Sequence, residues 1–315
     1  MRQYRTRIIA GACTIALLLT ISLLGGTSRV GILKDDIDVE TQLASSDDVG
    51  AFAVLRPQSS KCSVTKLSML YGTHRVPQLE HALLTHRRHS ERWGCGYEVL
   101  ERDLTSRKLF SKQYYLMSIM LRELAKPIEE RQEWLLWVDA DSMILNPALS
   151  PEIFLPPAHL KDVYALATAD HNGLNSGIFY LRVHPLALDL LTQTVAYPLS
   201  HPEDDLGWFS EQAAMAKVIE SRETNQTSQA YPGIVWMPRV WFNAYEFEFG
   251  FEGKPGHMMV HFAGLGEKRL LHISNWLEIL EQTPGKWEAP LEKTFYKTAI
   301  SEFWTDFEAN YTKRS

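Results

Sequence analysis

The sequence has no excess of basic residues and no repetitive or low-complexity tract. Its 32 lysines and arginines are outnumbered by 38 acidic residues, which gives a formal net charge of −6. The chain therefore lacks the basic field that binds a phosphate backbone, and we expect no nucleic-acid partner. Any phosphate it binds would meet a metal ion or a local basic group. A hydrophobic fraction of 45% over 315 residues suffices for the core of one large domain or two small ones.

Acidic residues are missing from the start of the chain. Three arginines within residues 1–7 precede a nearly unbroken apolar stretch at residues 8–26. This stretch is longer than the core of a secretory signal and suits a membrane-spanning signal anchor. The positive-inside rule then makes residues 1–7 a cytosolic tail and places the rest of the chain across the membrane. The alternative is a cleaved signal processed within residues 25–28.

The segment that follows, residues 27–59, lacks a periodic apolar face. It carries six acidic residues before residue 51, and we interpret it as a luminal stem. Two Asn-x-Ser/Thr triplets, residues 225–227 and 310–312, lie beyond the span, as glycosylation of an exported body would require.

Cysteine is scarce, with three residues in the chain. Cys13 lies in the apolar stretch, so Cys62 and Cys95 are the pair left for a disulfide outside it. Each precedes a predicted strand, and in an oxidising compartment they could form a bridge. The sequence leaves two buried free thiols as the alternative, because it does not supply the distance that a bridge needs.

From about residue 60, predicted strands and helices alternate. The strands are residues 63–72, 96–104 and 134–141, and the helices between them are residues 76–94 and 110–126. The third strand, WLLWVDAD, is apolar on both faces until its end, as expected of a central parallel strand covered by helices on each side. This order predicts a doubly wound α/β half.

The second half of the body is more mixed. Its predicted strands are residues 163–169, 177–183, 233–238 and 257–262, with helices at residues 184–197 and 210–221. These closer strands predict a small mixed sheet and a cleft that faces the first half. We therefore divide the body, residues 60–315, into halves 60–150 and 151–290 and a C-terminal extension, 291–315.

Two carboxylates, Asp139 and Asp141, end the third predicted strand. In open parallel sheets, ligands bind beyond the carboxyl ends of the strands. Carboxylates at positions i and i+2 can converge on one ion where the backbone turns, and oxygen ligands suit Mg²⁺ or Mn²⁺. The alternative is that they cap the next segment. Met143 argues against a haloacid-dehalogenase-type phosphatase, and the residues that follow lack the ligands and glycine of an EF-hand.

Four sequence blocks in this order resemble glycosyltransferase family 34. They are WLLWVDADSMILNP (134–147), LNSGIFYLR (174–182), SEQAAM (210–215) and HFAG (261–264). The family includes fungal α-1,2-galactosyltransferases and α-1,6-mannosyltransferases and plant xylosyltransferases. The resemblance extends over about residues 60–285 and implies an α/β fold of the GT-A type. In that fold a Rossmann-like mixed sheet is flanked by helices, here preceded by one transmembrane helix.

The resemblance also implies a metal site. In the family, the Asp-x-Asp loop and a late histidine hold a divalent ion, usually Mn²⁺, against the diphosphate of a nucleotide sugar. Carried over to this chain, Asp139, Asp141 and His261 would be the metal ligands, and Asp139 would also face the donor. A metal that bridges both phosphates makes the diphosphate a better leaving group. The alternative for His261 is a histidine whose hydrogen bonds are satisfied at a strand end.

The two middle blocks would lie at the reacting sugar. Asn175 to Gly177 matches the family's Asn-Thr-Gly segment, with Ser176 in place of threonine. The match implies a catalytic role for Asn175 and donor contacts for Ser176 and Gly177. Glu211 and Gln212 match an acidic-Gln pair with a catalytic role. The alternatives are an ordinary turn for the first segment and a dipole-stabilised acid in the first turn of a helix for the second.

The last block departs from the family. Its members often carry cysteine and then lysine directly after His-Phe-x-Gly, and the lysine contacts the diphosphate. Here the chain continues as HFAGLGEKR, so Gly264 would line the donor site, and Lys268 or Arg269 would have to reach the phosphates. Lys268 is the predicted contact.

The second half of the body is also rich in aromatic residues near predicted loops. They are Trp208, Trp236, Trp241, Phe242 and Tyr245. We expect most of them to be core residues. Those exposed at the cleft would stack on the acceptor's sugar rings.

Together these features predict a metal-dependent retaining glycosyltransferase. It would move a hexose from UDP-galactose or GDP-mannose to a mannose-containing glycan, as a single-pass type II protein of the Golgi membrane with a luminal catalytic body. Retention of the donor's α-configuration is implied by the resemblance alone. One alternative is a non-catalytic scaffold subunit of a Golgi mannosyltransferase complex, which the departure after HFAG favours. Another is a luminal metal-dependent hydrolase of nucleotide diphosphates.

Overall fold

The computed structural model describes residues 62–105, 108–224 and 233–312. The predicted tail, membrane span and stem lie outside these residues, as does the first glycosylation triplet. No helix within the described ranges is long and apolar enough to cross a membrane.

Most described strands belong to one mixed sheet. Its strands are β1 (Val64–Met69), β2 (Gly96–Leu100), β3 (Trp134–Val138), β5 (Ala165–Asp170), β6 (Gly173–Arg182) and β7 (Ile234–Trp236), in the order β2-β1-β3-β6-β5-β7. The first three are mutually parallel along this order, while β6 runs antiparallel to both of its neighbours. The predicted doubly wound half is thus present. The small sheet predicted for the second half is present only in part. The predicted strands at residues 163–169, 177–183 and 233–238 extend the sheet of the first half as β5, β6 and β7, and the predicted strand at residues 257–262 belongs to a separate, smaller sheet.

Strand β3 lies at the centre of this sheet and is buried on both faces. Trp134, Leu136 and Val138 enter one apolar core, while Leu135 and Trp137 enter the other. This alternation confirms the prediction from the apolar run, and a strand covered on both faces needs no polar side chain until its end. The strand was predicted to be parallel to its neighbours, but β3 is parallel only to β1 and runs antiparallel to β6.

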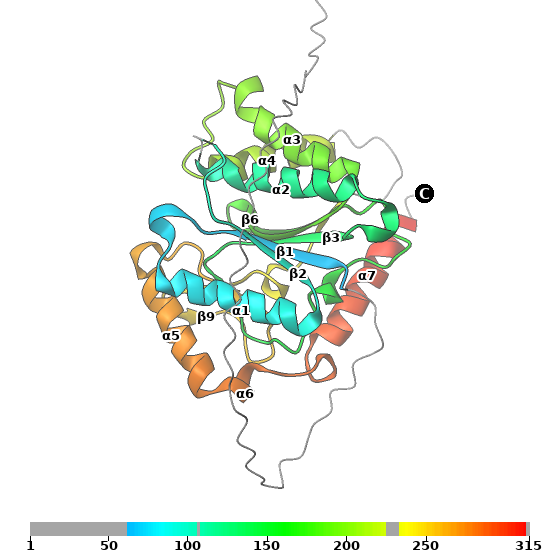
Figure 1. The fold of residues 1–315 in the computed structure, drawn as a ribbon. Coiled ribbons are helices and arrows are strands. Elements are labelled where there is room, and N and C mark those ends of the chain that lie inside the picture. The colour runs from blue at the N-terminus through cyan, green and yellow to red at the C-terminus, as the bar shows by residue number, and fades with distance from the viewer. Residues whose placement is uncertain (1–61, 106–107, 225–232, 313–315) are drawn as a thin grey trace, which may run out of the picture. The chain divides into compact units, whose positions relative to one another are not determined.

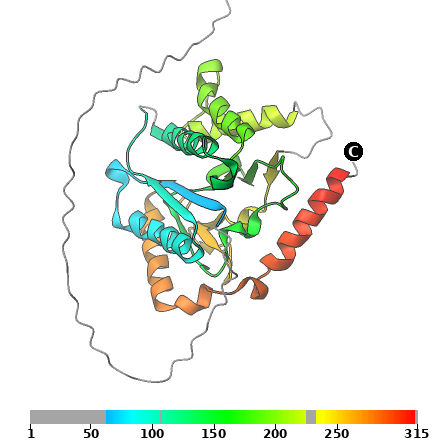
Figure 2. The same ribbon diagram turned by 45° about the vertical axis from the view of Figure 1, so that its right-hand side comes forward.

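Helices cover both faces of the sheet (Figure 1). They are α1 (Pro77–Trp93), α2 (Ser111–Leu124), α3 (Pro185–Ser200), α4 (Ser210–Thr224), α5 (Arg269–Gln282), α6 (Pro284–Trp287) and α7 (Tyr296–Thr312). Helices α2, α3 and α4 pack on one face through residues such as Leu116, Leu190 and Met215. On the other side lie α1 and α5, and α7 adds Trp304 to the core there. Figure 2 shows α7, in red, outside both helical layers.

Helix α1 begins and ends where its sequence predicts. Pro77 occupies the first turn, where its missing N–H costs no hydrogen bond. Gly94 terminates the helix in the left-handed conformation, with a φ of 67°. The chain can therefore turn at once into β2.

A smaller sheet joins segments that are far apart in the chain. Its strands are β4 (Ser142–Ile144), β8 (Ala244–Phe247), β9 (Gly250–Phe251) and β10 (Met259–His261), in the order β4-β10-β8-β9. Apolar side chains pack it against α1 and α5, among them Met143, Val260 and Ile273. Because β4 comes directly after β3, this pairing brings late segments of the chain to the carboxyl end of the central strand.

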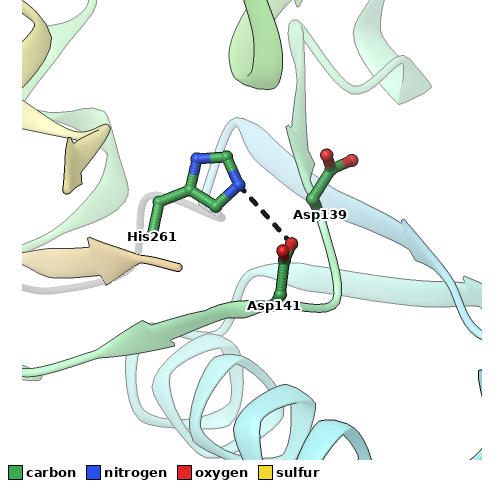
Figure 3. Close-up of side chains that lie close together, drawn as sticks. All are labelled: Asp139, Asp141 and His261. Atoms are coloured by element: carbon green, nitrogen blue, oxygen red, sulfur yellow. Dashed lines mark ion pairs between the residues drawn. The ribbon is translucent and has the colours of Figure 1, made fainter. Parts of the chain in front are cut away.

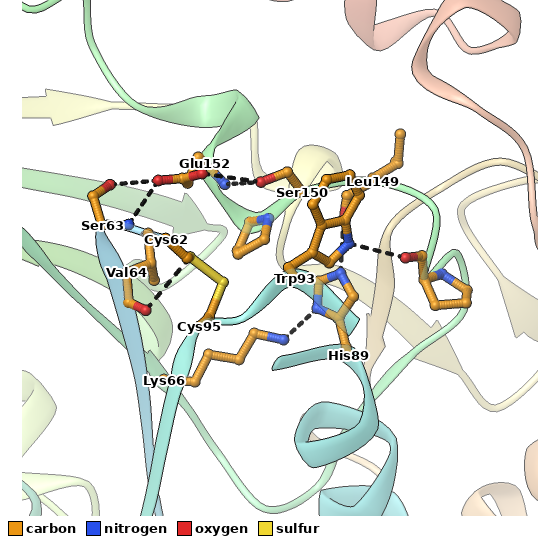
Figure 4. The surroundings of a disulfide bond; sticks show 12 residues. Cys62, Ser63, Val64, Lys66, His89, Trp93, Cys95, Leu149, Ser150 and Glu152 are labelled. Atoms are coloured by element: carbon orange, nitrogen blue, oxygen red, sulfur yellow. Dashed lines mark hydrogen bonds between the residues drawn. A yellow bond between two sulfur atoms is a disulfide. The ribbon is translucent and has the colours of Figure 1, made fainter. Parts of the chain in front are cut away.

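Cys62 and Cys95 form a disulfide (Figure 4). The bridge ties Cys62, two positions before β1, to Cys95, directly before β2, across 33 positions of sequence. The sequence left open whether these cysteines form a disulfide or remain buried free thiols, and in the structure they form the disulfide. A crosslink over a loop of this length stabilises a fold by about 2–4 kcal/mol.

Candidate functional site

Two carboxylates and a histidine meet between the two sheets. Asp139 follows β3 and Asp141 precedes β4, so the backbone turns between them. Strand β4 runs antiparallel to β10 with Ser142 opposite His261, and the Phe262 N–H donates to the Asp141 carbonyl oxygen over 2.9 Å. One ligand atom from each of Asp139, Asp141 and His261 lies within 4.8 Å of the others (Figure 3). Strand pairing thus brings the third predicted ligand to the first two.

This donor set fits a divalent cation. It offers two carboxylate oxygens and one imidazole nitrogen, a mixture that Mn²⁺ and similar ions accept. His261 is buried, and its Nε2 lies 3.4 Å from Oδ1 of Asp141. The three predicted ligands could therefore bind one metal ion.

Lys112 is a site residue that the sequence prediction missed. It lies in the first turn of α2, its side chain is 4% exposed, and its Nζ is 3.1 Å from Oδ1 of Asp139. The same ammonium donates to the Ser176 carbonyl over 2.9 Å, and the Trp137 indole donates to Asp139 over 2.7 Å. A lysine on the buried face of a helix, at its positive end, is unfavourable without a partner. The position of Lys112 in the predicted helix could therefore have identified it from the sequence as a site residue.

Arg269 lies beside the second carboxylate. Its Nε is 3.0 Å from Oδ2 of Asp141. Burial alone would raise the pKa of the Asp141 carboxyl, but His261 and Arg269 outweigh burial and hold this pKa well below its ordinary value. Lys268, the predicted diphosphate contact, lines the same cavity, but its ammonium pairs with the exposed Glu248. The structure thus places Arg269, rather than Lys268, at the carboxylates.

The Asn-Ser-Gly segment contacts the histidine side of the site. Asn175 Oδ1 accepts from the Gly177 N–H over 3.0 Å, but the three residues lie inside β6 and not in the turn that the alternative interpretation expected. A Cβ atom on Gly177 would lie 2.3 Å from Cε1 of His261, so only glycine leaves room for the ring. The segment therefore shapes the space around His261.

Glu211 and Gln212 lie in the first turn of α4, and Gln212 contacts the same segment. Gln212 Oε1 accepts from the Ser176 N–H over 2.8 Å and from the Ser176 hydroxyl over 3.2 Å. Glu211 is 5% exposed, and its Oε2 has no hydrogen-bond partner within the described part of the chain. Burial raises the pKa of the Glu211 carboxyl, although Lys112 opposes the shift. Gln212 thus orients Ser176, while one oxygen of Glu211 remains available.

All the predicted site residues line one cavity of about 730 Å³. They are Asp139, Asp141, Asn175, Ser176, Gly177, Glu211, Gln212, His261, Gly264 and Lys268. The structure brings them together, and their individual roles remain predictions.

Aromatic rings also border this cavity. Of the predicted aromatic group, Tyr245 lines it although it is 6% exposed, and so do Phe209 and Phe247, which the sequence prediction did not single out. Trp241 and Phe242 are core residues, as predicted for most of the group. Phe209 is 61% exposed and Phe247 is 47% exposed, so both rings are accessible from solvent.

Comparison with known proteins points to one class. No family model matches the chain. A "probable alpha-1,2-galactosyltransferase gmh1" from Schizosaccharomyces pombe is 26% identical over 174 residues, which are 42% of this chain and 48% of that protein. An alpha-1,2-galactosyltransferase from the same organism is 22% identical over 223 residues, 60% of this chain and 56% of that protein. The chain thus spans about half the length of the curated relatives it matches.

A solved structure supports the same class through its fold. A glycosyltransferase "involved in the glycosylation of the major capsid of PBCV-1" matches 67% of this chain and 98% of its own, with a TM-score of 0.50 and 14% identity. The described body therefore has a glycosyltransferase fold. In sequence the chain resembles family 34 glycosyltransferases, as the four blocks predicted.

Proposed function

We propose that the chain is a metal-dependent, retaining glycosyltransferase with a GT-A fold. It would transfer galactose or mannose from a nucleotide sugar to a mannose-containing glycan. One observation carries the proposal: Asp139, Asp141 and His261 converge in the cavity that also holds the Asn-Ser-Gly and Glu-Gln segments. The galactosyltransferase names of the relatives favour UDP-galactose as the donor.

The metal side of the cavity suits the diphosphate of the donor. A divalent ion, most simply Mn²⁺, bound to the three ligands would offset the charge that develops on the leaving nucleoside diphosphate. Lys112 and Arg269 add positive charge beside the same carboxylates, at 3.1 and 3.0 Å. A chain with no basic field elsewhere thus has local cations where the phosphates would bind.

The Asn-Ser-Gly and Glu-Gln segments, beside the metal ligands in the same cavity, suit the reacting sugar. Gln212 and Lys112 hold Ser176 from two sides through its backbone N–H and carbonyl groups. Such preorganised groups stabilise a transition state without first having to reorient. Glu211, with one buried and unpaired oxygen, would stabilise the positive charge that develops on the sugar ring. In a retaining step, the acceptor hydroxyl would pass its proton towards the leaving phosphate.

The outer part of the cavity suits a neutral glycan acceptor. The accessible rings of Phe209 and Phe247 offer apolar faces for the C–H faces of a sugar. Carboxylates of Asp170, Glu246 and Glu248 line the same cavity. They would repel a phosphate, but they can accept hydrogen bonds from sugar hydroxyls.

Two features support a location in the Golgi lumen. Residues 8–26 are the predicted signal anchor. The Cys62–Cys95 disulfide persists in an oxidising compartment and is rare in a cytosolic protein. The proposed topology is type II, with the catalytic body in the lumen.

The test is a donor panel with the purified full-length chain. UDP-galactose and GDP-mannose are incubated with Mn²⁺, with and without a mannose-containing glycan, and both transfer and hydrolysis are scored. We expect acceptor-dependent transfer that EDTA abolishes and that Asp141→Asn lowers about 100-fold or more, since a metal supplies several kcal/mol of transition-state stabilisation. Asp306→Asn, which changes an exposed carboxylate on α7, is the matched control.

Other outcomes identify the alternatives. Full transfer by Asp141→Asn in the presence of EDTA would exclude the metal assignment. Release of sugar at the same rate with and without acceptor would indicate a hydrolase. Donor binding by calorimetry without any product would favour the scaffold subunit, to which the departure after HFAG pointed.

A further inference from the structure

His261 has a buried hydrogen bond through Nδ1, the ring nitrogen away from Asp141. Its Nδ1 lies 2.8 Å from Oδ1 of Asn243. Asn243 directly precedes β8, which pairs in parallel with β10, so this contact joins neighbours in the small sheet. Asn243 is fully buried and does not line the cavity, so it does not reach a substrate itself.

The orientation of the Asn243 amide is fixed by its other contacts. Its Nδ2 donates to Thr168 Oγ1 over 2.8 Å and to Asn175 Oδ1 over 2.9 Å. Both donations come from the nitrogen, so the amide oxygen must be the atom that faces His261. The oxygen of Asn175 also accepts from the Gly177 N–H, which excludes its use as a donor here.

This orientation selects one form of the imidazole ring. An amide oxygen only accepts, so Nδ1 of His261 must carry the proton that it donates. In the neutral ring, Nε2 then carries a lone pair, and Nε2 is the nitrogen that lies 3.4 Å from Asp141. The opposite tautomer would leave the Asn243 oxygen facing a lone pair and would block metal binding through Nε2.

The glycine of the Asn-Ser-Gly segment completes this arrangement. The site where a Cβ atom of residue 177 would lie is 3.0 Å from His261 Nε2 and 2.3 Å from its Cε1. The ring cannot move away freely, because it is 3% exposed and held at Nδ1. Gly177 therefore gives the ring its place, and Asn243 sets its tautomer.

We propose that Asn243 is a positioning residue that holds His261 in the Nδ1–H tautomer and presents Nε2 to a divalent cation, with Gly177 providing the space for the ring. Asn175 then acts partly through Asn243, as part of the support of the metal ligand. The inference rests on the metal site of the proposed function. Residues that orient a ligating histidine typically contribute a factor of about 10–100 to metal affinity.

The experiment measures Mn²⁺ binding by the full-length chain without substrate, from the signal of free Mn²⁺ in electron paramagnetic resonance. Asn243→Leu removes the acceptor at similar volume, and we expect about 10–100-fold weaker binding. Asn243→Asp keeps an acceptor for Nδ1–H, and we expect affinity within about tenfold of the wild type, since carboxylates serve the same role in metal sites. Thr168→Val is the matched control, because it removes another partner of Asn243 and leaves His261 untouched.

A second readout needs neither metal nor activity. Nitrogen-15 NMR of histidine-labelled protein in mildly alkaline buffer reports which ring nitrogen carries the proton, and the His261 signals are assigned by their loss in His261→Gln. We expect the wild type and Asn243→Asp to have the proton on Nδ1, and Asn243→Leu to show a mixture of tautomers. Gly177→Ala should keep the tautomer but weaken Mn²⁺ binding, since the added methyl group displaces the ring.

Three results would overturn the inference. The first is an unchanged Mn²⁺ affinity in Asn243→Leu, and the second is a loss of Mn²⁺ affinity in Thr168→Val as large as that in Asn243→Leu. The third is a wild type in which Nε2 of His261, rather than Nδ1, carries the proton. A wild type that has the expected tautomer but binds no Mn²⁺ would instead contradict the proposed metal-dependent function. Thermal unfolding of each variant in EDTA separates these outcomes from a loss of folded protein.

Discussion

Glu211 carries a carboxyl group that burial makes costly to ionise. Its pKa is raised by burial first, and the nearby charge of Lys112 compensates only in part. One of its oxygens has no partner among the described residues. A protein gains nothing in stability from such a group, so its presence beside Ser176 and Gln212 is more readily explained by a task in the cavity.

We predict that Glu211→Gln raises stability and lowers transfer. Because the folded pKa lies above the unfolded one, the stability that the protonated carboxyl provides is present below the unfolded pKa of about 4.5 and is lost as pH rises through the folded pKa. Glutamine stays neutral, so the variant should melt higher than the wild type at about pH 7.5, with the difference vanishing near pH 4. Thermal unfolding across this range tests the point.

The matched control for this prediction is Glu220→Gln, which changes an exposed acid on the same helix. It should change neither the melting temperature nor transfer appreciably. A Glu211→Gln protein that melts lower than the wild type at neutral pH would refute the account of burial.

At the scale of elements, the contact between α1 and β1 is unusual because it buries three bases. Lys66 on β1 hydrogen-bonds His89 on α1, whose other nitrogen lies 2.7 Å from the Leu149 carbonyl oxygen (Figure 4). One turn earlier, His86 bonds Ser142, and the Ser142 hydroxyl donates to the Asp139 carbonyl over 2.6 Å. The interface therefore also supports the turn that carries the metal ligands.

This interface should make the protein sensitive to acid. Burial first, and the charge of Lys66 second, lower the pKa of both His86 and His89, and Arg92 adds to the shift of His89. In the unfolded chain both histidines become protonated below their ordinary pKa of about 6.5, whereas in the folded chain they stay neutral at that pH. The free energy of unfolding is thus at its full value above that pH. Below it, each of the two histidines lowers the free energy of unfolding by about 1.4 kcal/mol for every pH unit. Urea unfolding between about pH 7.5 and 5.5 measures this.

Replacing both buried histidines should flatten the pH profile. The double variant His86→Gln, His89→Gln should be less stable at neutral pH, because its packing is disturbed, but it should lose less stability on acidification. His81→Gln changes an exposed histidine on the same helix and should keep the steep profile of the wild type. An equally steep profile in the double variant would place the acid sensitivity elsewhere.

At the scale of the whole body, one disulfide links the starts of two neighbouring strands at an edge of the sheet. We predict that reduction lowers the free energy of unfolding by about 2–4 kcal/mol. Cys95→Ser should cause a similar loss without reductant, and dithiothreitol should then have no further effect. Denaturant unfolding of the full chain tests this, with Cys13→Ser as the control. A wild type that is indifferent to reductant would argue against a contribution of the bridge to stability.

Much of the larger sheet could be predicted from local patterns. The apolar run at residues 134–138 predicted a doubly buried strand, and Pro77 and Gly94 marked the ends of α1. The pairing of later strands could not be predicted in the same way. The composition of these strands suits either a separate sheet or an extension of the larger one. They extend the larger sheet because their side chains are buried there against α3 and α4.

By itself, the sequence determined the periodic elements, the two carboxylates at the end of β3 and the four blocks that resemble family 34. These are local properties, set by side-chain alternation and by residue type. Only the tertiary structure decided that His261 meets Asp141, that Lys112 neutralises Asp139 and that Asn243 faces the imidazole. These contacts join residues 18 to 120 positions apart. The two contacts of His261 form because β4 and β8 both pair with β10, whereas Lys112 reaches Asp139 from α2. Sequence alone does not determine which strand edges meet.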